Sequence, residues 1–151
     1  NGKEINRNQL IALMAAILAP DYSGSTIVTD SVTSDELTTF LEKNLGLKHL
    51  RFKRGYKNVI NKCIELNNAG VISPLAIETS GHGALSENYY LDDGAYLAVK
   101  LLTAAAQLRR KGCRLSELIK DMKEPVEAKE YRLRISGTDD FKTYGQNVLK
   151  E

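Results

Sequence analysis

The sequence predicts an α/β protein, built as a three-layer α/β/α sandwich around a mostly parallel sheet. Helical and strand-like patterns alternate over residues 8–111, which is typical of parallel strands joined by helical crossovers. The 151 residues suffice for one domain with its own core, and 42% of them are apolar. In such a sheet the loops after the strands open onto one edge, where ligands bind.

The expected helices combine apolar residues at helical spacing with recognisable ends, such as Pro20 after the first helix. They are expected over residues 8–18, from a Ser34 cap to Gly46, from Gly55 to Gly70, and from an Asp92 or Asp93 cap to Gly112. Short runs rich in β-branched or apolar residues predict strands over residues 25–30, 49–53 and 72–78. After residue 129 the pattern changes to one alternating strand and a helix capped by Thr138, which we interpret as a linker and the opening of a further domain.

Composition excludes several classes of protein. The net charge is only +2, and the basic residues are scattered, which argues against nucleic-acid or membrane-surface partners. The longest apolar run, LIALMAAILAP, is too short to span a bilayer. No CxxC motif is present, and Cys63 lies on the apolar face of a helix, so we expect a buried, reduced thiol in a cytoplasmic protein.

The most informative motif is ETSGHG, which directly follows the third expected strand. Ionised Glu78 accepts hydrogen bonds only, and the Ser80 hydroxyl both donates and accepts, so the two suit the hydroxyl groups of a sugar. His82 adds an imidazole, and the neighbouring glycines let the backbone approach a ligand. An ordinary glycine turn with solvated side chains fits the same residues.

Two other functions remain open from the residues alone. Ser80 with His82 as its base would make a small hydrolase, although the sequence lacks a G-x-S-x-G elbow. A non-enzymatic α/β ligand-binding or interaction module is the main alternative. Its nucleotide-binding form would need a glycine-rich turn after the first strand, which DSVTSDE does not offer.

Two motifs near the strand ends admit a structural and a functional interpretation. The two aspartates of LDDG (residues 91–94) could hold a metal, but a helix cap is favoured. KRGYK (residues 53–57) could bring cations and backbone N–H groups to an anionic ligand, or it could be a solvated basic turn. We expect Tyr89, Tyr90 and Tyr96 to pack against the core rather than to stack on a ligand.

RISGTDD (residues 134–140) has the letters of a phosphate cradle. Asp139 and Asp140 would repel a phosphate at the start of the following helix, so a strand end followed by a capped helix is favoured.

Taken together, these motifs resemble the α-D-phosphohexomutases, the phosphoglucomutase/phosphomannomutase enzymes. ETSGHGALSENYYLDDGAYLAVKLL is similar to the family's sugar-binding loop and the helix after it, KRGYKNVI to its Lys-x-Gly-His/Tyr-Lys segment, and NGKEINRNQLIALMAAIL to the stretch after its metal-binding loop. The resemblance covers residues 1–124, and residues 125–151 are expected to be the linker and the start of the next domain.

The resemblance implies a four-domain enzyme of which this chain is the third, sugar-binding domain. The first domain of such enzymes carries a phosphoserine, the second binds Mg²⁺ on an Asp-rich loop, and the fourth binds the substrate phosphate. The implied partners are therefore a hexose phosphate and the other domains of the same chain, with Mg²⁺ held outside this fragment and no catalytic residue within it.

The resemblance also assigns roles to single residues. Glu78 and Ser80 would bind sugar hydroxyls, His82 would lie beside them, and Lys53 and Tyr56 would lie on the neighbouring loop near the substrate. Some family members have a Gly where this chain has Ile77, or a Lys where it has Val32 or Thr33, which leaves the preferred hexose open.

Overall fold

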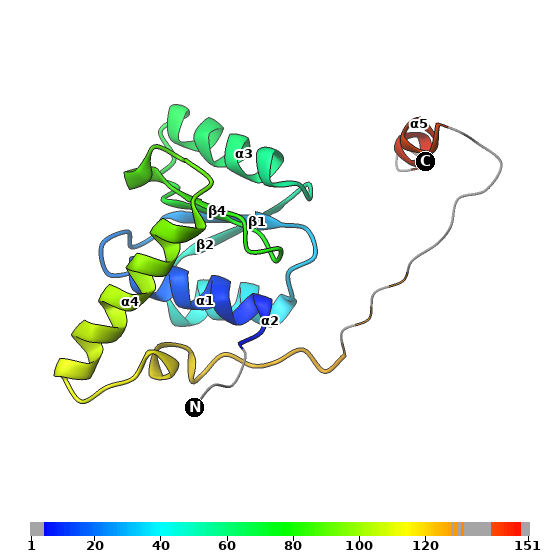
Figure 1. The fold of residues 1–151 in the computed structure, drawn as a ribbon. Coiled ribbons are helices and arrows are strands. Elements are labelled where there is room, and N and C mark those ends of the chain that lie inside the picture. The colour runs from blue at the N-terminus through cyan, green and yellow to red at the C-terminus, as the bar shows by residue number, and fades with distance from the viewer. Residues whose placement is uncertain (1–4, 128, 130, 132–139, 149–151) are drawn as a thin grey trace.

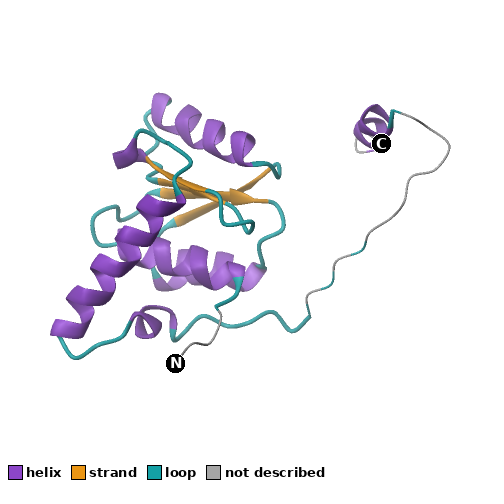
Figure 2. Cartoon of the chain, viewed as in Figure 1, coloured by secondary structure: helices purple, strands orange, loops and turns teal. Residues whose placement is uncertain are grey.

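A computed structural model describes residues 5–127, 129, 131 and 140–148 of the chain (Figures 1 and 2). Its elements, in order, are α1 (Arg7–Leu18), β1 (Thr26–Asp30), α2 (Asp35–Thr39), the π-helical turn η1 (Phe40–Asn44), β2 (Lys48–Phe52), α3 (Tyr56–Asn68), β3 (Leu75–Ile77), β4 (Gly83–Leu85), the 3₁₀ turn η2 (Ser86–Asn88), α4 (Gly94–Arg110), the 3₁₀ turn η3 (Leu115–Ile119) and α5 (Phe141–Val148). The predicted alternation of helix and strand is confirmed.

The sheet has the strand order β2-β1-β3-β4. β1 runs parallel to both β2 and β3, whereas β4 is antiparallel to β3, so the sheet is mostly parallel as predicted. β4 itself was not predicted, since the sequence analysis treats these residues as part of the ligand loop. Leu85 of β4 lies opposite Leu75 of β3. After the ETSGHG loop the chain therefore runs back along β3 in the opposite direction.

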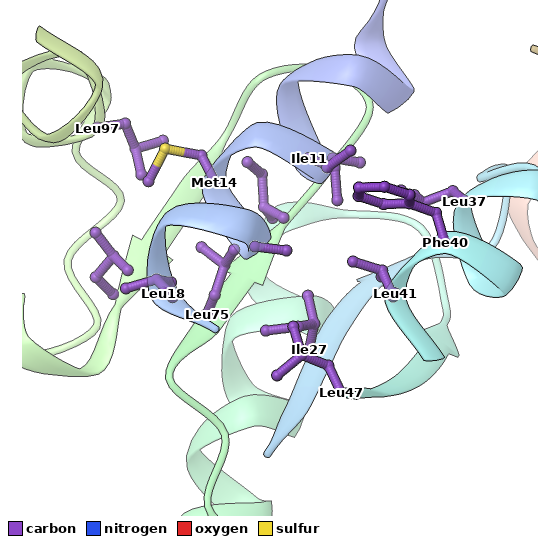
Figure 3. Packing of buried hydrophobic residues seen from close by; sticks show 14 residues of the cluster. Ile11, Met14, Leu18, Ile27, Leu37, Phe40, Leu41, Leu47, Leu75 and Leu97 are labelled. Atoms are coloured by element: carbon purple, nitrogen blue, oxygen red, sulfur yellow. The ribbon is translucent and has the colours of Figure 1, made fainter. Parts of the chain in front are cut away.

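Helices cover both faces of the sheet (Figure 1). α1, α2 and α4 lie on one face, and their side chains form the larger core cluster with the strands. The cluster centres on fully buried residues such as Ile11, Met14 and Ile27 (Figure 3). α3 covers the opposite face, where Val59 and Cys63 contact Val28 of β1 in a smaller cluster. This arrangement is the predicted α/β/α sandwich.

Local signals fix the helix ends. The Ser34 hydroxyl accepts a hydrogen bond from the backbone N–H of Leu37, as expected for an N-cap. Gly46 and Gly112 follow the helical segments with positive φ angles of 66° and 75°, a conformation that glycine adopts without steric cost. Cys63 is a free, buried thiol as predicted, and burial raises its pKa to about 11.

Part of the carboxyl-terminal prediction lies outside the described residues. Most of the alternating strand near residues 130–135, the Thr138 cap and most of RISGTDD fall on residues 130 and 132–139, which the structure does not describe. The expected helix after them is present as α5, with the Asp140 carboxylate accepting from the backbone N–H of Thr143. Within the described residues, none of the helices has the length and apolar character needed to cross a membrane.

Candidate functional site

The candidate site lies where the parallel strands end. Asp30, the last residue of β1, is in register with Phe52, the last residue of β2, and Thr29 is in register with Ile77, the last residue of β3. The loops that follow β2 and β3 therefore leave the sheet at the same edge. KRGYK spans the first of these loops and the start of α3, so that Tyr56 is the first helical residue and does not lie on the loop itself. ETSGHG forms the second loop and ends at the first residue of β4, so the fold brings the two motifs together.

Glu78 joins the two loops. Glu78 is buried, with only 5% of its surface exposed. Its Oε1 accepts a hydrogen bond of 2.6 Å from the backbone N–H of Gly55 in the β2–α3 loop. Gly55 has a φ of 117°, a backbone conformation that favours glycine and that places its N–H toward the carboxylate. The second carboxylate oxygen, Oε2, accepts from the Ser80 hydroxyl at 3.2 Å.

These two contacts leave hydrogen-bonding capacity at the site. A carboxylate has about four lone-pair positions, so roughly two remain on Glu78. Ser80 is exposed, and its hydroxyl donates its hydrogen to Glu78. The lone pairs of the Ser80 oxygen are therefore left to accept a hydrogen bond from a ligand. The pair can therefore accept hydrogen bonds from neighbouring hydroxyl groups of a ligand.

His82 lies beside this pair as an oriented ring. Its side chain is 52% exposed, and Nδ1 lies 2.7 Å from Oδ2 of Asp92. Because an ionised carboxylate only accepts, Nδ1 carries the hydrogen and Nε2 is the nitrogen left to meet a ligand. The Tyr56 ring stacks on the imidazole with centroids 5.1 Å apart, so the two predicted loops meet here as well.

Asp92, considered in the sequence as a metal ligand or helix cap, has a different role in the structure. The two aspartates of LDDG make different contacts. Asp93 caps α4, because its side chain accepts a hydrogen bond from the backbone N–H of Tyr96 at 3.0 Å. Asp92 instead uses Oδ2 for His82 and Oδ1 for the backbone N–H of Gly83. An adjacent Asp pair after a His-containing loop is the signal in the sequence, but only the fold shows which of the two aspartates turns toward the ring.

The structure also places Lys53 and the three tyrosines of the sequence predictions, and one of these predictions is wrong. Lys53 is exposed at the end of β2, and within the described residues it forms no ion pair. Tyr90 and Tyr96 pack against the two core clusters as expected. Tyr89 is 87% exposed, so the expectation that it packs is wrong; its positive φ of 54° turns the chain and leaves the ring outside.

The hydrolase arrangement is not assembled in this structure. The Ser80 hydroxyl donates to Glu78 and not to His82, and no hydrogen bond joins Ser80 to His82 in the described part of the chain. Residues 5–127, 129, 131 and 140–148 also contain no group of three or more His, Cys, Asp and Glu side chains that could hold a metal ion. The geometry supports hydrogen-bonded ligand recognition more directly than nucleophilic catalysis.

The fold and the site thus define an α/β domain with polar loops at the carboxyl ends of its parallel strands. A family model described as "Phosphoglucomutase/phosphomannomutase, alpha/beta/alpha domain III" matches residues 6–125. The chain belongs to this family, and the family prediction is confirmed.

Individual relatives agree with this assignment. The chain is 32% identical over 120 residues to a phosphoglucosamine mutase of Thermotoga petrophila, a match that covers 78% of this chain and 26% of the relative. It is 32% identical over 127 residues to a phosphoglucosamine mutase of Dictyoglomus turgidum, with 82% and 26% covered. The chain therefore spans about a quarter of the length of these curated relatives.

A solved structure supports the fold. A phosphoglucomutase/phosphomannomutase family protein from Burkholderia thailandensis superimposes with a TM-score of 0.66 at 27% identity, covering 83% of this chain and 25% of that chain.

Proposed function

We propose that this chain is the sugar-recognition domain of a phosphohexomutase, an enzyme that interconverts hexose 1-phosphate and hexose 6-phosphate through a bisphosphate intermediate. The observation that carries the proposal is the buried Glu78 carboxylate, which is shared between two strand-end loops and bonded to an exposed serine hydroxyl. Membership of the domain III family and the phosphoglucosamine mutases among the relatives support it.

In this proposal Glu78 and Ser80 hold adjacent sugar hydroxyls. Gly55 fixes one carboxylate oxygen, so the lone pairs that remain point in set directions before the ligand arrives. Such preorganisation matters because phosphoryl transfer depends on positioning and charge neutralisation more than on covalent chemistry by the protein. A sugar held at this edge would keep one hydroxyl directed at the phosphoryl donor.

His82, Tyr56 and Lys53 would complete the binding surface. The free Nε2 of His82 can hydrogen-bond a sugar hydroxyl, and Asp92 keeps the ring from rotating. The Tyr56 ring stacks on one face of the imidazole and so restricts its movement on that side. Lys53 has no carboxylate partner among the described residues, so its charge is available to a phosphate group near the β2 end.

The remaining chemistry would come from other domains of the full-length enzyme. By resemblance to the family, the phosphoserine and the Mg²⁺-binding loop belong to the first and second domains, and Mg²⁺ would neutralise charge on the transferring phosphoryl group there. We therefore propose that this chain alone catalyses no mutase turnover and binds hexose phosphates weakly.

The hexose is left to experiment. Two relatives carry the name phosphoglucosamine mutase, whereas the matched domain model is described by phosphoglucomutase and phosphomannomutase. Amino-sugar, glucose and mannose phosphates are accordingly all candidate substrates.

The test is an NMR titration of the ¹⁵N-labelled chain with glucosamine 6-phosphate, glucose 6-phosphate and mannose 6-phosphate, with inorganic phosphate as the control. We expect saturable shifts of the Gly55, Ser80 and Gly83 amides with at least one sugar phosphate and smaller shifts with phosphate alone. Equal responses to all four compounds would show charge binding without sugar recognition. No response at this edge would favour the non-enzymatic interaction module.

A coupled assay of hexose 1-phosphate turnover checks the second part of the proposal. The purified chain should show only background rates. Turnover that is abolished by Glu78→Gln would prove that the chain is itself a mutase and would overturn the assignment of catalysis to other domains.

A further inference from the structure

Asp30 is a buried carboxylate that the proposed function does not use. It ends β1 with 0% of its surface exposed, and within the described residues no ion pair includes it. Burying a carboxylate without a cation is costly unless hydrogen bonds compensate. Both side-chain contacts of Asp30 go to one residue: Oδ2 accepts from the Thr79 hydroxyl at 2.6 Å, and Oδ1 accepts from the Thr79 backbone N–H at 3.3 Å.

Thr79 stands between the two proposed sugar-binding residues. It is 6% exposed, so its hydroxyl faces inward, while Glu78 and Ser80 on either side reach the Gly55 N–H and the surface respectively. Thr79 and Ser80 are the two central residues of a turn, which the Gly81 N–H closes by donating to the Glu78 carbonyl at 3.0 Å. Because the three residues follow one another in so short a turn, the Asp30–Thr79 contact, here called the clamp, fixes the backbone from which Glu78 and Ser80 present their oxygen atoms.

A chain of hydrogen bonds holds Asp30 in turn. The Thr33 hydroxyl donates to the Asp30 backbone carbonyl at 3.2 Å, and Thr29 Oγ1 lies 3.2 Å from Thr33 Oγ1 and 2.8 Å from Nε2 of His49. His49 Nδ1 lies 2.8 Å from the Thr38 hydroxyl. The network therefore runs from α2 through β2 and β1 to the loop after β3, and it anchors the loop to three rigid elements.

We propose that Asp30 is a positioning residue of the sugar-binding loop: its carboxylate, through Thr79, sets the direction in which Glu78 and Ser80 present their oxygen atoms. The proposal rests on the proposed function for its effect on ligand binding, but the clamp itself is a property of the free chain. Asp30 would touch no ligand and would act only through Thr79.

The test compares Thr79→Val, which removes the hydroxyl at nearly constant shape, with the matched variant Thr79→Ser, which keeps it. In the free ¹⁵N-labelled chain, Thr79→Val should shift the Gly55 amide, because that N–H reports the position of the Glu78 carboxylate, and Thr79→Ser should leave it near its original frequency. An unmoved Gly55 amide in a folded Thr79→Val chain overturns the proposal whatever the ligand does.

The second arm measures binding of the sugar phosphate that gives the strongest response. Thr79→Val should weaken binding about tenfold, the effect of one lost hydrogen bond, and Thr79→Ser should bind as the unmodified chain does. Glu78→Gln is the reference for the proposed function. If Glu78→Gln weakens binding and Thr79→Val does not, the clamp is refuted and the sugar site survives.

If Glu78→Gln has no effect on binding, the proposed function fails, and the Gly55 amide still decides whether the clamp exists. Should the valine variant not fold, Thr79→Ala removes the same hydroxyl with less bulk and takes its place in both arms.

Discussion

His49 should make the stability of this domain depend on pH. Both ring nitrogens lie 2.8 Å from threonine hydroxyls, those of Thr29 and Thr38. Burial, with a smaller contribution from the Arg51 charge, lowers the pKa of His49 from 6.5 to about 4. As the pH falls below 6.5, the unfolded chain gains a proton that the folded chain does not, so the free energy of unfolding decreases.

The size of this effect follows from the shift. The folded-state pKa of His49 is lower than its unfolded-state pKa, so its contribution to the free energy of unfolding is fully present above pH 6.5. That contribution is lost as the pH falls from 6.5 to about 4, and it changes no further below pH 4. At about 1.4 kcal/mol for each unit of pKa, the loss amounts to roughly 3 kcal/mol. That is a large part of the stability of a typical domain, about 5–15 kcal/mol.

The assay is urea unfolding at several pH values between 7.5 and 4.5. The matched control is His49→Gln, which can still hydrogen-bond the threonines but does not titrate in this range, so its pH dependence should be flatter. A His82→Gln background leaves one histidine for an NMR titration of the folded state. Equal pH slopes for the unmodified chain and His49→Gln, or a His49 ring that titrates near 6.5 in the folded chain, would show that burial does not lower the pKa of His49.

Four backbone and capping substitutions give further predictions, each measured by urea unfolding. Gly55→Ala should destabilise the chain by about 1–3 kcal/mol, because φ is 117° at this position. The matched control is Gly94→Ala at the start of α4, where an added Cβ would meet open space, and it should be neutral or stabilising by up to about 1 kcal/mol. A larger loss of stability for Gly94→Ala than for Gly55→Ala would contradict the geometry. Gly83→Ala should cost about 1–3 kcal/mol, because its Cβ would lie 2.7 Å from Cδ1 of Leu97, and an unchanged midpoint would mean that Leu97 moves freely. Asp93→Ala should cost about 0.5–2 kcal/mol through the lost cap of α4, and a null result would show that the cap contributes nothing.

The order of elements and the edge that carries the site could be predicted because both depend on local pattern. Apolar spacing located α1 and α3, Ser34 marked the start of α2, and the rule for parallel sheets placed the ETSGHG and KRGYK loops at one edge. These signals are contained within a few residues of each other in sequence. They needed no knowledge of distant contacts.

The features that escaped prediction depend on contacts between distant residues. β4 is three residues long and begins with glycine, so its strand character comes from pairing with β3 and not from propensity. Asp92 and Asp93 have the same chemistry, and only the path of the chain turns one toward His82. The Asp30–Thr79 contact joins residues 49 positions apart, and no local pattern marks it.

Glu78→Gln in the full-length protein tests whether this chain is the sugar-recognition domain of the proposed phosphohexomutase. Glutamine can keep both structural contacts, since its oxygen can accept from Gly55 and the Ser80 hydroxyl can rotate to accept from its amide, so the fold should survive. We expect kcat/KM to fall about tenfold or more at an unchanged melting temperature, because a pure acceptor has become a partial donor. An unchanged kcat/KM in the folded variant would contradict it and remove Glu78 from the sugar site.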